Sequence, residues 1–107
     1  MSDIYAKENC GSGVAIEANN IINLTKLNVY RNGLAGSASG VTVISNNANI
    51  NVTSANIIGN ANYGVQATAG SGTLTIKQSN YFGNHFFALP VGTPNINMIS
   101  GTLVIIP

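Results

Sequence analysis

Charge is scarce in this chain of 107 residues. Four Lys and Arg residues stand against three Asp and Glu residues, so the formal net charge is +1 and the charged fraction is 7%, far below that of a typical soluble domain. A chain without a basic tract has no electrostatic footprint for nucleic acid. The apolar residues form no long run of the kind that a membrane-spanning helix needs. We therefore expect neither nucleic-acid binding nor membrane insertion.

Reactive side chains are also few. Cys10 is the only cysteine and His85 the only histidine, which excludes a disulfide framework within the chain and a multi-cysteine zinc site. The acids Asp3, Glu8 and Glu17 all lie near the start of the sequence. Glycoside hydrolysis needs two carboxyl groups roughly 5–9.5 Å apart, and calcium usually needs several carboxylates. We predict no catalytic residue, no metal site and no cofactor in this chain.

Asparagine takes the place of charge. The chain has 17 Asn, 9 Ser and 8 Thr residues, yet 45% of it is hydrophobic, which distinguishes it from a disordered polar segment. The pattern Asn-x-apolar-x-Asn occurs at residues 28–32, 56–60 and 80–84, with a weaker copy at 5–9. A Gly-Val pair precedes the last three closing Asn residues, at 13–14, 40–41 and 64–65. Because the two patterns recur with similar spacing, they indicate an internal repeat of about 25 residues.

Each repeat contains three short segments in which apolar and polar residues alternate, as in half-buried strands. Three strands in so few residues leave no room for crossover helices. We therefore predict an all-β fold, a right-handed parallel β-helix of about four coils with three short strands per coil. The predicted interior consists of Ile22, Leu24, Tyr30, Val41, Val43, Ile50, Val52, Ile58, Val65, Leu74, Ile76 and Phe82, whereas Ile44, Ile57, Val104 and Ile106 are expected to point outward.

Stacked coils bring equivalent residues to one strand spacing, ~4.8 Å. Side-chain amides at that distance can hydrogen-bond from coil to coil. The repeat thus predicts two structural ladders of asparagines. One consists of Asn32, Asn60 and Asn84, and the other of Asn28, Asn56 and Asn80.

The Asn-x-apolar-x-Asn and Gly-Val pattern resembles the parallel β-helix repeats of pectate-lyase-like proteins. Such repeats occur in polysaccharide lyases and hydrolases, phage tailspikes and bacterial surface proteins. The resemblance covers residues 3 to about 91 and implies a fold, which many functions share. We assign residues 1–91 to the coils, and residues 92–107 to an irregular segment and terminal strand of the same domain.

The resemblance is closest in character to the β-helical part of a phage tailspike or tail fibre. It implies a non-catalytic structural module that recognises a receptor, a surface polysaccharide, on a virion tail or an extracellular surface. The expected glycan contacts are Tyr63, Tyr81 and His85. The alternatives are a bacterial extracellular adhesin or surface module, and a fragment of a polysaccharide-degrading enzyme whose acids lie elsewhere. The sequence does not determine the compartment.

The C-terminal part is apolar and uncharged. In residues 101–107, Leu103 and Ile105 occupy one alternating face of a predicted strand, and Val104 and Ile106 the other. A strand that is apolar on both faces needs a partner on each, since such a patch is rarely left in water. We therefore expect a homo-oligomer, with a trimer implied by the tailspike resemblance.

Overall fold

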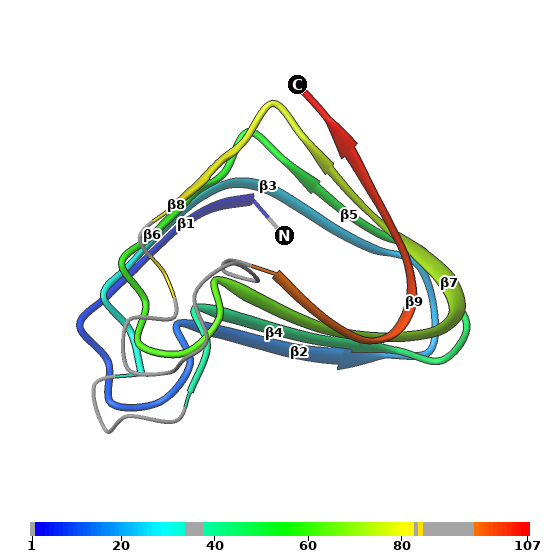
Figure 1. Cartoon of the computed structure of the whole chain (residues 1–107), viewed down its shortest axis with the longest axis horizontal. Helices are drawn as coiled ribbons and strands as arrows, with labels where there is room; N and C mark the ends of the chain where they lie inside the picture. Colours follow the sequence, from blue (N-terminus) through cyan, green and yellow to red (C-terminus); the bar gives the residue numbers. More distant parts are fainter. Residues whose placement is uncertain (1, 34–37, 83, 85–95) are drawn as a thin grey trace.

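The computed structural model describes residues 2–33, 38–82, 84 and 96–107, with only the backbone of Tyr81 and Phe82. The described part of the chain is all-β, and every strand pair in it is parallel. The strands are β1 (Ser2–Lys7), β2 (Val14–Ala18), β3 (Ile22–Tyr30), β4 (Val41–Ser45), β5 (Ile50–Thr53), β6 (Asn56–Ile58), β7 (Val65–Lys77), β8 (Asn80–Phe82) and β9 (Ile96–Ile106). They wind as a parallel β-solenoid (Figure 1), which confirms the predicted fold class. Across the described ranges, no helix is long and apolar enough to cross a membrane.

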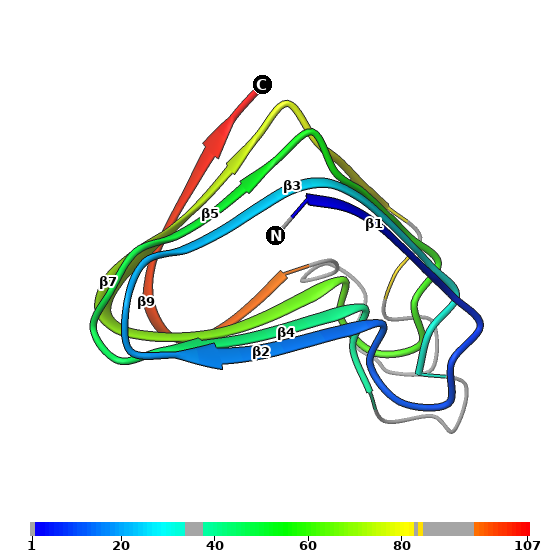
Figure 2. The ribbon, with the colours of Figure 1, turned by 180° about the vertical axis from the view of Figure 1, so that it is seen from behind.

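The strands line three sides of the solenoid, which we name after β4, β5 and β6. The β5 sheet contains residues 22–25, 50–53, 73–77 and 102–106, with Ser2 paired to Thr25 at its edge. The β6 sheet contains residues 4–7, 27–30, 56–58 and 80–82. The β4 sheet contains residues 14–18, 41–45, 65–68 and 96–100. The long strands β3, β7 and β9 bend at a corner and so belong to two sheets each. Seen from either end, the outline is triangular (Figures 1 and 2).

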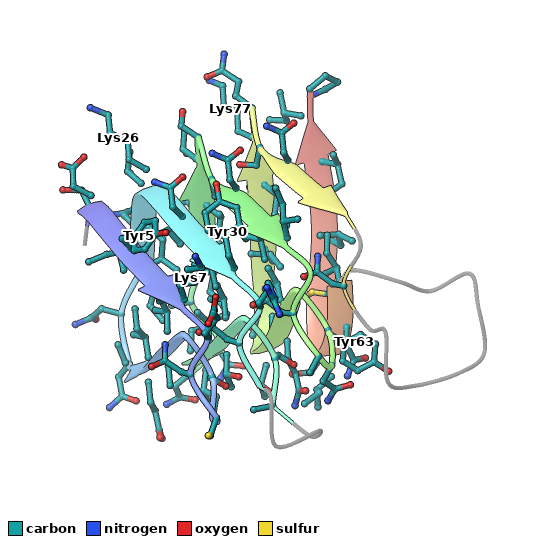
Figure 3. The ribbon with its side chains drawn as sticks, turned by 90° about the vertical axis from the view of Figure 1, so that its left-hand side faces the viewer. Tyr5, Lys7, Lys26, Tyr30, Tyr63 and Lys77 are labelled. Atoms are coloured by element: carbon teal, nitrogen blue, oxygen red, sulfur yellow. The ribbon has the colours of Figure 1, made fainter. Side chains whose placement is uncertain are left out.

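The solenoid is right-handed. In Figure 1 the chain runs anticlockwise from β1 through β2 to β3. Figure 3 shows the coils advancing in order from the N-terminal end to the C-terminal end, and the C-terminal end is the one nearer the viewer of Figure 1. An anticlockwise path that approaches the viewer is right-handed. The described residues make about three turns, slightly fewer than the four expected. Residues 85–95, which stand between β8 and β9 in the sequence, lie outside the described residues. Strand β9 pairs along β7, so the terminal segment extends the same solenoid.

Single residues in the left-handed conformation form the corner between the β5 and β6 sheets. Lys26, Ser54 and Gln78 have φ values of 56°, 56° and 51°. Such a residue interrupts the pleat, and the side-chain alternation shifts by one position beyond it. In β3, Leu24 points inward before the corner, and Leu27 points inward after it.

Because of this corner, the interior residues predicted for the third strand of the coil are wrong. Tyr30 and Ile58, expected inside, are only half-buried. Val29 and Ile57 lie inside instead, fully buried, so Ile57 is also not outward as expected. The side chain of Phe82, the third residue predicted in this row, lies outside the described residues.

The rest of the predicted interior is confirmed. Buried apolar side chains form one core cluster that runs along the solenoid axis. It includes the predicted residues Ile22, Leu24, Val41, Val43, Ile50, Val52, Val65, Leu74 and Ile76. Register pairs place like above like, as in Ile22 with Ile50 and Ile50 with Leu74. Each outward face is thus a set of straight rows, one residue per coil.

Candidate ligand-binding face

An inner ladder of asparagines lies where the β6 sheet turns towards the β4 sheet. Nδ2 of Asn32 donates to Oδ1 of Asn60 at 3.0 Å, and Nδ2 of Asn60 donates to Oδ1 of Asn84 at 2.8 Å. Asn9 adds an exposed rung, with its Nδ2 donating to Oδ1 of Asn32 at 2.8 Å. The structure therefore brings together the three predicted residues of this ladder and a fourth from the weaker repeat.

Asn60 shows why this ladder is structural. Its Oδ1 accepts a second hydrogen bond from the backbone N–H of Asn32 at 2.9 Å, and its Nδ2 donates a second to the carbonyl of Val29 at 3.2 Å. An amide has two hydrogens and two acceptor sites, and here all four are used. A fully buried amide of this kind has nothing left for a ligand.

A second, outer ladder crosses the β6 sheet. Nδ2 of Asn56 donates to Oδ1 of Asn28 at 3.0 Å, and Nδ2 of Asn80 donates to Oδ1 of Asn56 at 2.9 Å. Asn28 and Asn56 are half-buried and Asn80 is exposed. Unlike the inner ladder, this one faces solvent and can contact a ligand.

Two tyrosines join the outer ladder at its N-terminal end. Tyr5 pairs in register with Asn28 and so extends the row by one coil. The rings of Tyr5 and Tyr30 have centroids 6.1 Å apart and are tilted by 54°, and the Tyr30 hydroxyl donates to Oδ1 of Asn28 at 3.3 Å. Figure 3 views this surface directly and shows both tyrosines over the first two strands of the β6 sheet.

We call this surface the tyrosine–asparagine face; it consists of Tyr5, Asn28, Tyr30, Asn56 and Asn80. It combines an exposed aromatic ring with a row of amides. An aromatic ring packs against the apolar C–H face of a sugar, and amides bond to hydroxyl groups. These are the two kinds of contact that a glycan site needs.

Basic residues border this face. Lys26 and Lys77 lie along one rim and Lys7 near the other in Figure 3, and Arg31 follows β3 directly. Two acids reduce the charge here, since Asp3 lies in β1 and Glu8 forms an exposed ion pair with Lys7 at 3.4 Å. Four basic residues against two acids leave the face mildly positive.

The predicted glycan contacts do not form one described cluster. Tyr63 is half-buried in the turn between β6 and β7, and Figure 3 shows it well away from Tyr5 and Tyr30. Tyr81 pairs in register with the buried residue Ile57, and its side chain lies outside the described residues, as does His85. The role of these three residues stays a prediction.

A shallow hollow of about 360 Å³ lies on a different side of the solenoid, over the β4 sheet and its turn into the β5 sheet. Its polar lining is partly occupied, because Oδ1 of Asn47 accepts from the Ser71 N–H and Oγ of Ser100 accepts from the Gly70 N–H. Among the described residues of its lining, Glu17 is the one carboxylate and none is aromatic. The described lining therefore lacks the stacking surface that the tyrosine–asparagine face has.

The acids are spread over the molecule. Asp3 lies near the start of β1 and Glu8 directly after its end, which puts them roughly 16 Å apart at the rise of an extended strand. Glu17 belongs to β2 on the β4 sheet. Among the residues that the structure describes, no group of three His, Cys, Asp or Glu side chains could hold a metal ion.

The sequence analysis placed Tyr30 in the interior and did not predict that Tyr5 and Tyr30 meet. The signal was present in the repeat spacing. The closing residues Asn9 and Asn32 are 23 positions apart, and the same offset takes Tyr5 to Asn28. The corner at Lys26 then turns Tyr30 outward beside them, which the assumed interior position of Tyr30 had concealed.

Fold and surface together define a parallel β-solenoid with a tyrosine–asparagine face. No protein-family model matches the chain, and neither a curated protein nor a solved structure shows significant similarity to it.

Proposed function

We propose that this chain is a non-catalytic structural module that recognises a surface glycan through its tyrosine–asparagine face. The proposal depends on one observation: the ring of Tyr5 lies against that of Tyr30, and the Tyr30 hydroxyl bonds to the amide of Asn28. This geometry supports sugar binding because it presents a ring surface and hydrogen-bonding groups on one rigid sheet. Binding residues on strands are held in place better than residues on loops.

The biological setting follows from the resemblance of the repeat. We propose the β-helical part of a phage tailspike or tail fibre, acting on a virion tail or at an extracellular surface. A bacterial adhesin or surface module would use the same face in the same way. A fragment of a polysaccharide-degrading enzyme is the other alternative, with its acids on another chain or segment.

The distribution of acids supports a non-catalytic role. A glycosidase pair is roughly 5–9.5 Å apart, whereas Asp3 and Glu8 lie near opposite ends of β1 and Glu17 on another sheet. At the rise of an extended strand, the Cα atoms of Asp3 and Glu8 are roughly 16 Å apart. The proposed activity is therefore binding without cleavage.

A glycan array probed with the purified chain tests the proposal. We expect retention on at least one surface polysaccharide, and loss of retention in the double variant Tyr5→Ala/Tyr30→Ala. Tyr63→Ala is the aromatic comparison, because Tyr63 was itself expected to contact a glycan and lies away from this face. Melting curves of each variant show that the fold is kept. Failure to bind any glycan, or retention that depends on Tyr63 and not on Tyr5 and Tyr30, would overturn the assignment of this face.

A further inference from the structure

We infer that the ligand of the tyrosine–asparagine face is a linear polysaccharide that lies along the solenoid axis, with one sugar unit on each coil. This inference rests on the proposed function and specifies it. It names the shape of the glycan, an extended chain running across the strands, as opposed to the terminal sugar of a branched one.

The first observation is a straight row of side chains. Register pairs Tyr5 with Asn28, Asn28 with Asn56, and Asn56 with Asn80. Because neighbouring strands are ~4.8 Å apart, the row spans roughly 14 Å. A sugar unit of an extended β-linked chain is close to one strand spacing in length. A chain of four sugars that lies along the axis therefore places one sugar unit beside each of the four residues in the row.

The second observation is unused hydrogen-bonding capacity that repeats from coil to coil. Asn56 gives one N–H to Asn28 and accepts one from Asn80. An amide has two hydrogens and two acceptor sites, so these contacts use half of its capacity. Asn28 differs, because its Oδ1 accepts from both Asn56 and Tyr30 and only its N–H groups remain. Each amide of the row thus keeps at least one N–H group, which suits a polymer that carries the same hydroxyl groups on every unit.

The third observation is the open ring at the end of the row. Tyr5 is 66% exposed, so it offers a surface to the apolar face of a terminal unit. The Tyr30 hydroxyl bonds to Asn28 and thereby ties the aromatic pair to the amide row. A single sugar on this surface would reach one or two coils, and single hydrogen bonds made in competition with water contribute little. Binding strength must therefore come from several coils together.

Titration calorimetry of the full chain with oligosaccharides of increasing length tests the inference. The probes are β-1,4-linked glucose, N-acetylglucosamine and mannose oligomers of one to six sugars. We expect the affinity for at least one series to rise by about tenfold, equivalent to ~1.4 kcal/mol, from disaccharide to tetrasaccharide. It should then level off, because the described row ends at Asn80.

Variants of the row locate the effect. Asn56→Ala should remove most of the gain from disaccharide to tetrasaccharide, because it interrupts the middle of the row. Asn51→Ala is the matched control: Asn51 makes the same kind of ladder bond, to Asn23 at 3.0 Å, but on the β5 sheet. If Asn56→Ala lowers the melting temperature, the exposed Asn80→Ala replaces it and should lower the affinity for the tetrasaccharide alone.

The outcomes separate this inference from the proposed function. Equal affinity for a monosaccharide and a tetrasaccharide would identify a terminal-sugar site, so the inference would fail and glycan recognition would stand. Failure of all three series, with a positive glycan array, would also overturn the inference alone. A negative array overturns the proposed function and the inference with it.

Discussion

At the scale of single residues, the two asparagine ladders look alike in sequence and differ in burial. Asn60 uses both amide hydrogens and both acceptor sites inside the solenoid. Asn56 makes two ladder bonds on the half-exposed outer face. The inner ladder therefore needs asparagine itself, whereas water can replace bonds in the outer one.

Replacing Asn60 with Asp tests this difference. The new carboxylate would face Oδ1 of Asn84 and the carbonyl of Val29, which are acceptors, without a hydrogen to donate. We expect the free energy of unfolding to fall by about 3 kcal/mol or more, measured by chemical denaturation. Asn56→Asp is the control, with a loss below about 1 kcal/mol at its half-exposed site. Equal losses would show that burial does not distinguish the ladders.

The corner residue sets which side chains enter the core. Ile57 is fully buried, and its neighbour Ile58 is half-buried on the outside of the same strand. We expect Ile57→Asp to unfold the chain, because an unpaired charge would lie in the core. Ile58→Asp should cost about 1 kcal/mol. Circular dichroism and denaturant titration of the pair measure the contrast, and the reverse order of effects would contradict the observed register.

At the scale of elements, the Gly-Val marker of the repeat has a steric cause. A Cβ atom added at Gly40 would lie 2.6 Å from Cγ of Asn60, and one at Gly13 would lie 2.7 Å from Nδ2 of Asn32. Contacts this short force a shift. A glycine thus stands directly before β2 and before β4, because the residue at this position packs on the amide of the inner ladder.

Gly40→Ala should therefore disturb the ladder as well as the strand. We expect a loss of about 1–3 kcal/mol in the free energy of unfolding, the usual cost of overpacking a tight site. Gly11→Ala is the matched control, because an added Cβ there meets nothing within 4 Å. Thermal melts of the two variants give the comparison. A Gly40→Ala variant as stable as Gly11→Ala would mean that the ladder does not require this glycine.

The elements also show how far sequence could predict the structure. Alternation and spacing gave the strands of the β4 and β5 sheets and the register between coils, because stacked coils keep like residues together. They predicted the wrong inward-pointing residues in β3 beyond Lys26 and at Ile57, because one left-handed corner residue shifts the alternation by one position. No composition signal marks Lys26 or Ser54 as a corner. The ring contact of Tyr5 with Tyr30 depends on that corner, so the alternation did not predict it.

At the scale of the whole molecule, the two ends of the solenoid differ. The strand at the N-terminal end, β1, carries Asp3 and Lys7, and charged side chains discourage pairing of strand edges. Strand β9 at the other end has no charged residue. Its residues Leu103, Val104, Ile105 and Ile106 are 38–41% exposed, which leaves both faces of the strand partly open to water.

Self-association through β9 is the prediction that follows from this asymmetry. Val104 and Ile106 pair in register with the outward residues Thr75 and Lys77, so a partner on the outer face of the β5 sheet would cover them. We expect light scattering at micromolar concentration to give the mass of a homo-oligomer, with three copies as the first expectation. Val104→Lys/Ile106→Lys should yield a folded monomer, because it places charges in the contact.

Thr75→Lys is the control for this prediction, since it adds a charge to the same sheet one coil from β9 and leaves the apolar strand intact. It should lower the association constant less than the double variant does. Salt dependence gives a second readout: contacts between apolar strands persist when charges are screened, so the wild-type oligomer should survive high ionic strength. A monodisperse wild-type monomer would rule out association through β9 and would leave the exposed residues of that strand without a role in assembly.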